Sequence, residues 1–231
     1  MTRIFALGGG EIGRQKVMPD GSVKQYPVET LSIDTEIIKT TGKTNPILLF
    51  IGTASNESDS YSKAVLDHFG GRLGCTITEL KLLNELPRKE QITQKINDAD
   101  IIYVGGGDTK LMLDTWKKHG VDKMLVDAWK SGKILSGLSA GAICWFDYYD
   151  NEEYIDGDMA KLDVLPGLGL ISGFAGVHWD TMSDEYKEAV AKLLARKKIK
   201  GWAIDNSAAI LENNGKISIL SGMAGRIARQ I

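Results

Sequence analysis

Short apolar runs alternate with longer amphipathic stretches along this chain, and this alternation limits its fold more than any other feature. The runs end at glycine or serine turns, and they are Arg3–Leu7, Ile47–Ile51, Ile77–Leu80, Ile101–Val104 and Lys133–Leu138. Continuous runs of this length predict strands that are buried on both faces of a parallel sheet.

The stretches between the runs have the apolar spacing of helices that bury one face. They are Tyr61–Phe69, Leu111–His119, Met124–Trp129 and Tyr186–Leu194. Asp108 and Gly120 stand where the second of these helices would begin and end, as a capping aspartate and a left-handed glycine do. The repeated strand–helix order implies right-handed crossovers, and therefore an α/β fold of three layers with a mostly parallel sheet.

The C-terminal part of the chain has a different pattern, because its apolar runs are short and follow one another closely. They are Trp202–Asp205, Ala208–Leu211 and Lys216–Leu220. Asn213-Asn214-Gly215 is a strong hairpin signal, so we expect an antiparallel C-terminal edge on the sheet. No linker rich in serine or proline interrupts the sequence, and residues 1–231 are predicted to form one domain. Met1–Thr44 would supply the first strand and an outer helix.

The composition argues against several classes of protein. The 231 residues are 43% hydrophobic and 25% charged with a net charge of −2, unlike a disordered chain or a protein that binds nucleic acid through a basic face. No apolar stretch is long enough for a membrane span or a signal peptide. Cys75 and Cys144 are too few for a disulfide scaffold, so we expect reduced thiols and a cytoplasmic location.

The motif that points most directly to chemistry is Gly137-Leu138-Ser139-Ala140-Gly141. It follows a predicted strand and precedes Ala142–Phe146, an apolar stretch that could begin a helix. In this setting G-x-S-x-G is typical of a nucleophile elbow, where flanking glycines allow a tight turn and helix amides can stabilise an oxyanion. The simpler interpretation is an ordinary strand–helix turn.

A second glycine turn, Gly105-Gly106-Gly107-Asp108, also follows a predicted strand and opens a helix. Adjacent parallel strands bring their carboxyl ends together, so its amides could complete an oxyanion hole beside Ser139. Its spacing does not match a phosphate-binding loop. The alternative is a flexible turn with a capping aspartate. Gly8-Gly9-Gly10 is similar, but no candidate nucleophile accompanies it, and we interpret it as a plain turn.

A nucleophilic serine needs a base, and the chain has three histidines. His68 falls on the apolar face of a predicted helix and His119 at the end of another, so both are interpreted as structural. His178 lies in a short apolar segment outside any helical pattern, and it is the best candidate base by elimination. The alternative is a buried structural histidine.

The residue that orients the base is harder to choose. One acidic run holds Asp147, Asp150, Glu152, Glu153, Asp156 and Asp158, and such runs are usually solvated loops. Asp205-Asn206 ends a predicted strand, where a carboxylate or an amide oxygen could accept the Nδ1 proton of a histidine. No group of cysteines, histidines and carboxylates has the spacing of metal ligands, so no metal and no cofactor are expected.

Together these motifs resemble peptidase family S51, which includes dipeptidase E and cyanophycinase. The resemblance is carried by the Gly105–Thr109 turn, the Gly137–Ala142 elbow and a later histidine, His178, and it covers most of the chain from Ile47 onward. It implies a flavodoxin-like α/β sandwich of the class I glutamine amidotransferase type, with serine in place of the catalytic cysteine of the amidotransferases.

The resemblance also implies roles for particular residues. Ser139 would be the nucleophile, His178 the base, and the amides of Gly107 and Ala140 the oxyanion donors, with Gly106 in the same turn. Family members orient the histidine with an acidic residue either between serine and histidine, where Asp156 stands, or after a late strand, where Asp205 stands. Cyanophycinase-like members carry glutamate where this chain has Asn206. We favour Asp205, then Asn206 as its substitute, then Asp156.

The sequence therefore predicts a serine-type peptidase that hydrolyses short peptides, as a monomer or homodimer with no nucleic-acid or membrane partner. The resemblance implies cleavage of Asp-X dipeptides. However, Asp180, Asp184 and Glu185 lie close to His178 in sequence, and such acidic surroundings suit a free α-amine better than an acidic side chain. The alternatives are an esterase or amidase on the same elbow, and a non-enzymatic binding member of the fold.

Overall fold

A seven-stranded sheet runs through the centre of the computed structural model, which describes residues 1–84, 86–152 and 155–231. Its strand order is β13-β12-β1-β7-β6-β4-β5. The strands are β1 (Arg3–Leu7), β4 (Ile47–Ile51), β5 (Thr76–Leu80), β6 (Ile101–Val104), β7 (Ile134–Leu138), β12 (Ala208–Asn213) and β13 (Lys216–Ser221). The five strands from β1 to β5 in this order are parallel, and β12 and β13 add an antiparallel edge, as predicted.

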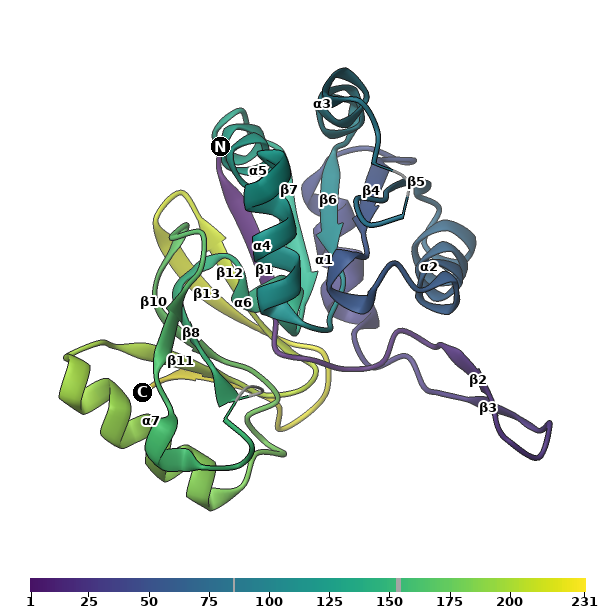
Figure 1. Ribbon diagram of the computed structural model, residues 1–231. Coiled ribbons are helices and arrows are strands. Elements are labelled where there is room, and N and C mark those ends of the chain that lie inside the picture. The colour runs from purple at the N-terminus through teal and green to yellow at the C-terminus, as the bar shows by residue number, and fades with distance from the viewer. Residues whose placement is uncertain (85, 153–154) are drawn as a thin grey trace.

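Helices cover both faces of this sheet and complete the three predicted layers (Figure 1). One face carries α1 (Leu31–Thr40), α2 (Asp59–Val65) and η2 (Leu66–Arg72), and the other carries α3 (Lys89–Asp98), α4 (Thr109–His119) and α5 (Val121–Lys130). The capping prediction for α4 is confirmed, because Asp108 accepts a hydrogen bond from the Leu111 amide and Gly120 has a φ of 72°. The hairpin prediction is confirmed too, since Asn214 and Gly215 both have positive φ.

A second sheet was not predicted. It has five strands in the order β14-β11-β10-β8-β9. They are β8 (Phe146–Asp150), β9 (Val164–Pro166), β10 (Ile171–Gly176), β11 (Gly201–Ile204) and β14 (Ala228–Gln230), with α7 (Asp184–Lys197) following β10. The prediction that β11 belongs to the edge of the main sheet is therefore wrong. A short apolar strand carries no local signal of which sheet it joins, and β11 pairs with β10 and β14.

The acidic run also differs from the predicted solvated loop. Its first part is strand β8, where Asp147 accepts a hydrogen bond from the Gly173 amide at 2.9 Å. The helix expected over Ala142–Phe146 is the single turn α6 (Ala140–Ile143), because the chain turns into β8 directly afterwards. Glu153 of the run lies outside the described residues.

The first part of the chain supplies β1 and α1, as expected, and a feature that was not expected. The hairpin of β2 (Gln15–Val17) and β3 (Val23–Gln25) extends away from the sheet as an arm (Figure 1). No helix of the described residues has the length and apolar character needed to cross a bilayer.

Both cysteines are buried and unbonded, which leads to a chemical prediction. Burial raises the pKa of the Cys75 thiol to about 11 and holds the pKa of Cys144 well above its usual value. At pH 8 the reactive thiolate is therefore scarce in the folded chain. We expect iodoacetamide to leave both residues unmodified in the native protein and to alkylate both in urea, as counted by mass spectrometry. Rapid alkylation of either one in the native protein would contradict this view of the core.

Candidate active site

Ser139 stands at a sharp turn between β7 and α6. Its backbone has φ 58° and ψ −118°, a conformation that L-residues rarely adopt and that is characteristic of strained functional positions. The Ser139 amide donates to the Leu7 carbonyl at 3.0 Å, and its own carbonyl accepts from the amides of Ala142 and Ile143. These bonds fix the residue at the carboxyl ends of β1 and β7.

The glycines on either side of Ser139 are required by close contact with neighbouring backbone. A Cβ atom on Gly137 would lie 2.1 Å from the Gly141 carbonyl oxygen, and one on Gly141 would lie 2.1 Å from the Val104 carbonyl oxygen. No side chain fits at either position. The G-x-S-x-G pattern therefore has the geometry of the predicted elbow.

His178 follows β10 and contacts Ser139 directly. Its Nε2 atom lies 2.9 Å from Ser139 Oγ, and its Nδ1 atom lies 2.7 Å from Asn206 Oδ1. The His178 amide donates to the Gly8 carbonyl at 2.9 Å, which ties the histidine to the end of β1. Serine, histidine and asparagine thus form one continuous hydrogen-bonded chain.

Asp205, which we favoured as the partner of His178, lies elsewhere. Its carboxylate accepts from the Ile227 amide at 3.3 Å and pairs with Arg229 at 3.4 Å. Asp156, the third choice, is exposed in the loop after β8. Neighbouring residues at the end of a strand point to opposite sides, so position in the sequence alone did not distinguish Asp205 from Asn206.

The turn at Gly8-Gly9-Gly10, interpreted as a plain turn, lies directly against His178 and Asn206. A Cβ atom on Gly9 would lie 2.1 Å from Asn206 Oδ1 and 2.4 Å from the ring of His178. A signal for it was present, because a glycine triplet follows the strand here just as in the Gly105–Gly107 turn. What the sequence did not show is that β1 pairs with β7 in a register that places Leu7 opposite Leu138.

The Gly105–Gly107 turn lies on the other side of Ser139. A Cβ atom on Gly106 would be 3.1 Å from Ser139 Cβ, and the Gly106 amide donates to the Tyr61 hydroxyl at 3.2 Å. Gly107 lines a small cavity together with Ala140, the first residue of α6. The first amides of a helix have no partner within the helix, so the Ala140 amide is available to a ligand.

Two cavities meet at Ser139 and His178. The larger, of about 770 Å³, is bordered by Gln15 at the start of the arm and is lined by Glu11, Arg14 and Tyr61 among others. The smaller, of about 90 Å³, contains Asp150 and Glu152. Ser139 and His178 therefore line both cavities.

Charge is distributed unevenly between the two cavities. In the larger one the Arg14 guanidinium is held by Glu11, with its Nε 2.8 Å from one carboxylate oxygen. In the smaller one the Tyr186 hydroxyl donates to Asp150 at 2.7 Å. Burial raises the pKa of the Asp150 carboxyl, and the Tyr186 hydrogen bond opposes that shift. Among the described residues, the small cavity is lined by two carboxyl side chains and no arginine or lysine, whereas the larger is lined by Glu11, Glu29 and Arg14.

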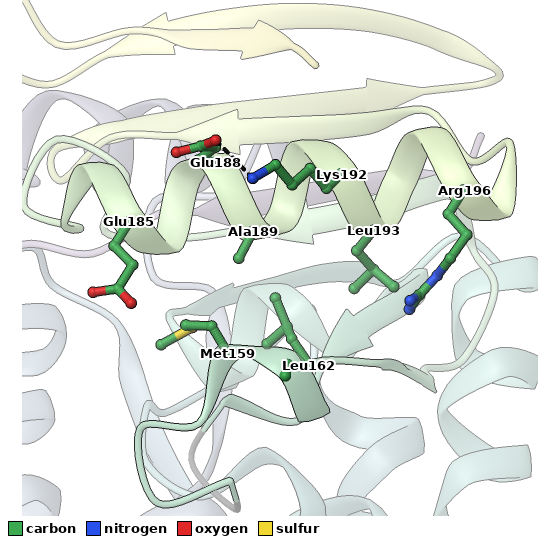
Figure 2. A pocket seen from close by; sticks show the side chains of 9 residues that line it. Met159, Leu162, Glu185, Glu188, Ala189, Lys192, Leu193 and Arg196 are labelled. Atoms are coloured by element: carbon green, nitrogen blue, oxygen red, sulfur yellow. Dashed lines mark ion pairs between the residues drawn. The ribbon is translucent and has the colours of Figure 1, made fainter.

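The other histidines and one further cavity lie apart from the hydrogen-bonded residues Ser139, His178 and Asn206. His68 is fully buried with Nε2 2.8 Å from Asp34, consistent with the structural interpretation, and His119 ends α4. A separate hollow of about 370 Å³ lies between η4 (Met159–Lys161) and α7, and Figure 2 shows Glu188 and Lys192 paired there. The described residues include no group of three or more potential metal ligands.

Similarity to known proteins shows the family of this chain. The model of peptidase family S51 matches residues 20–220. The chain belongs to peptidase family S51. A relative in Bacillus subtilis strain 168, the uncharacterized peptidase YgaJ, is 33% identical over 211 residues, which are 91% of this chain and 83% of the relative. Membership of the family supports a peptidase activity for this S51 chain.

A solved structure shares the S51 chain's fold. A peptidase from an acI-B1 Actinobacterium superposes with a TM-score of 0.72 at 20% identity, over 100% of this chain and 94% of that one. At this identity the likeness shows the fold alone. It confirms the predicted α/β architecture, including the mostly parallel sheet.

The close contact at the S51 elbow predicts the effect of a single methyl group. We expect Gly141→Ala to lower the free energy of unfolding by about 1–3 kcal/mol, because the added carbon overlaps the Val104 carbonyl. Gly71→Ala is the matched control, since the nearest atom to its Cβ is 4.0 Å away. Urea unfolding curves compare the two. Equal midpoints for both variants would rule out the steric explanation.

Proposed function

We propose that this chain is a serine peptidase that hydrolyses short peptides through an acyl-enzyme on Ser139. The observation that carries the proposal is the hydrogen-bonded chain from Ser139 Oγ through the two nitrogens of His178 to Asn206 Oδ1. An amide oxygen only accepts, so His178 carries its proton on Nδ1 and presents an unprotonated Nε2 to the serine. This is the protonation state that a general base requires.

The proposed reaction then follows in two halves. Ser139 Oγ attacks the scissile carbonyl carbon while His178 Nε2 takes the hydroxyl proton, and the amides of Gly107 and Ala140 stabilise the oxyanion. His178 gives the proton to the leaving amine as the C–N bond breaks. A water molecule gives a proton to the same nitrogen and attacks the acyl carbon. The bond between that carbon and Ser139 Oγ then breaks, the acid leaves, and His178 returns the proton to Ser139 Oγ.

We further propose that the substrates are unblocked peptides. The small cavity brings two carboxyl side chains, Asp150 and Glu152, close to Ser139, and a protonated α-amine is the group that such surroundings favour. Among the described residues that line the larger cavity, Arg14 is the one arginine or lysine, and it is paired with Glu11. An aspartyl side chain would therefore compete with Glu11, which argues for substrates beyond Asp-X.

The nucleophile is tested by hydrolysis of a dipeptide panel. We expect Ser139→Ala to lower kcat/KM by at least about 1,000-fold, because the acyl-enzyme cannot form without the hydroxyl. The panel contains Asp-X and neutral dipeptides, and hydrolysis of each is measured by the release of free amine. Unchanged cleavage by Ser139→Ala would disprove the mechanism. If Ser139 supports hydrolysis of p-nitrophenyl esters and of no dipeptide, the activity is that of an esterase. If neither class of substrate is hydrolysed, the result favours a binding protein.

The amine subsite makes a separate prediction. We expect N-acetylation of a good dipeptide substrate to lower kcat/KM at least about tenfold, because the charge that pairs with the acidic cavity is lost. Glu152→Gln should raise KM for the free peptide and leave KM for the acetylated peptide unchanged. Glu188→Gln, an exposed carboxylate on α7, is the matched control. Equal cleavage of free and acetylated peptides would contradict the subsite.

A further inference from the structure

We propose that Asp180 is a positioning residue of this site, which holds the Asn206 amide in the one orientation that keeps the proton of His178 on Nδ1. The inference rests on the proposed function for its catalytic consequence. The orientation itself is a property of the folded chain and can be measured without any substrate.

The contacts of Asp180 place it behind Asn206, on the side away from His178. Asp180 Oδ1 accepts two hydrogen bonds from Asn206, one from the side-chain Nδ2 at 3.0 Å and one from the backbone amide at 2.7 Å. Its other oxygen pairs with Arg226. The Asp180 side chain is 12% exposed, so water competes little for these contacts. Asp180 is thus fixed on both oxygens.

A carboxylate in this position selects one of the two orientations of the Asn206 side-chain amide. The Asn206 side chain can present either its oxygen or its NH2 group to His178, and the two orientations differ only by a flip about the last bond. An ionised carboxylate accepts hydrogen bonds and donates none, so Asp180 holds the NH2 group and turns the oxygen toward Nδ1. The flipped amide would place the histidine proton on Nε2, where the ring could no longer take the proton of Ser139.

The same contact explains why residue 206 is an amide. A carboxylate at 206 would lie about 3 Å from the Asp180 carboxylate, and like charges at that distance prevent both from ionising. An amide between the imidazole and the carboxylate satisfies all three groups. The negative charge near His178 thus belongs to Asp180, two positions after the histidine in sequence. Asn206 lies between the Asp180 carboxylate and the imidazole.

The backbone holds the two loops in this arrangement. The Trp179 amide donates to the Ile204 carbonyl at 3.1 Å, and the Ser207 amide donates to the Gly9 carbonyl at 3.0 Å. Trp179 immediately precedes Asp180, and Ser207 immediately follows Asn206. The distance between the carboxylate and the amide is therefore set by the fold and does not depend on the side chains alone.

An exchange of the two side chains tests the proposal. The variants are Asp180→Asn, Asn206→Asp and the double variant with both changes, which preserves the number of carboxylates and amides. We expect Asp180→Asn to lower kcat about 10- to 100-fold with a smaller change in KM, because a charged hydrogen bond is lost and the amide is free to flip. Asn206→Asp should also lose activity at neutral pH through the carboxylate pair. The double variant should be at least about tenfold more active than the weaker single variant, since a carboxylate then contacts His178 directly.

A direct measurement accompanies the kinetics. The nitrogen NMR shifts of His178 report which ring atom carries the proton. We expect the Nδ1–H form in the wild type and in Asp114→Asn, which removes an exposed carboxylate from α4, and a mixture of both forms in Asp180→Asn. Circular dichroism and thermal unfolding verify that each variant is folded.

Each outcome has a stated meaning. The proposal is overturned if folded Asp180→Asn keeps only the Nδ1–H form, whatever its activity, or if the double variant is no more active than the weaker single variant. If Asp180→Asn does not fold, the comparison of Asn206→Asp with the double variant decides. Unchanged hydrolysis by Ser139→Ala would remove the proposed function, and the NMR measurement would still decide the role of Asp180.

Discussion

The parallel pairing of β7 with β1 on one side and β6 on the other is the interaction on which the site depends. This register places Leu7 opposite Leu138 and Val104 opposite Gly137. Three glycine-containing turns therefore leave the sheet at the same edge, one from each strand. A shift of one residue in either pairing would move Ser139 away from its neighbours and reverse the faces of the buried side chains. The buried runs that fix the register thus also fix the geometry of the proposed nucleophile.

Close backbone contact is the second requirement. Gly9 lies against His178 and Asn206, Gly137 and Gly141 against the elbow, and Gly107 against the Ala54 carbonyl. At each of these positions a Cβ atom would lie within 2.5 Å of another atom, so the loops approach one another more closely than ordinary residues allow. The hydrogen bonds from Ser139 through His178 to Asn206 are possible because glycine occupies each of these contact positions.

The sequence predicted the elements whose signals are local. The buried strands, the capped helix α4 and the hairpin at Asn214 and Gly215 each follow from a few adjacent residues. The second sheet did not, because β8 and β11 are short and their partners are distant in sequence. The choice between Asp205 and Asn206 failed for a related reason. Both residues fit the chemistry, and only the folded loop decides which of them faces His178.

The site is divided between the two sheets, and this division has a consequence for biosynthesis. Ser139 and Gly107 follow strands of the main sheet, whereas His178 follows β10 and Asn206 follows β11 of the second. Synthesis from the N-terminus completes the β1, β4, β6 and β7 segments before His178 leaves the ribosome. A nascent chain at that stage carries the serine turn with neither of its hydrogen-bond partners. Ser139 can therefore contact His178 only after β10 of the second sheet has been synthesised and has taken its place.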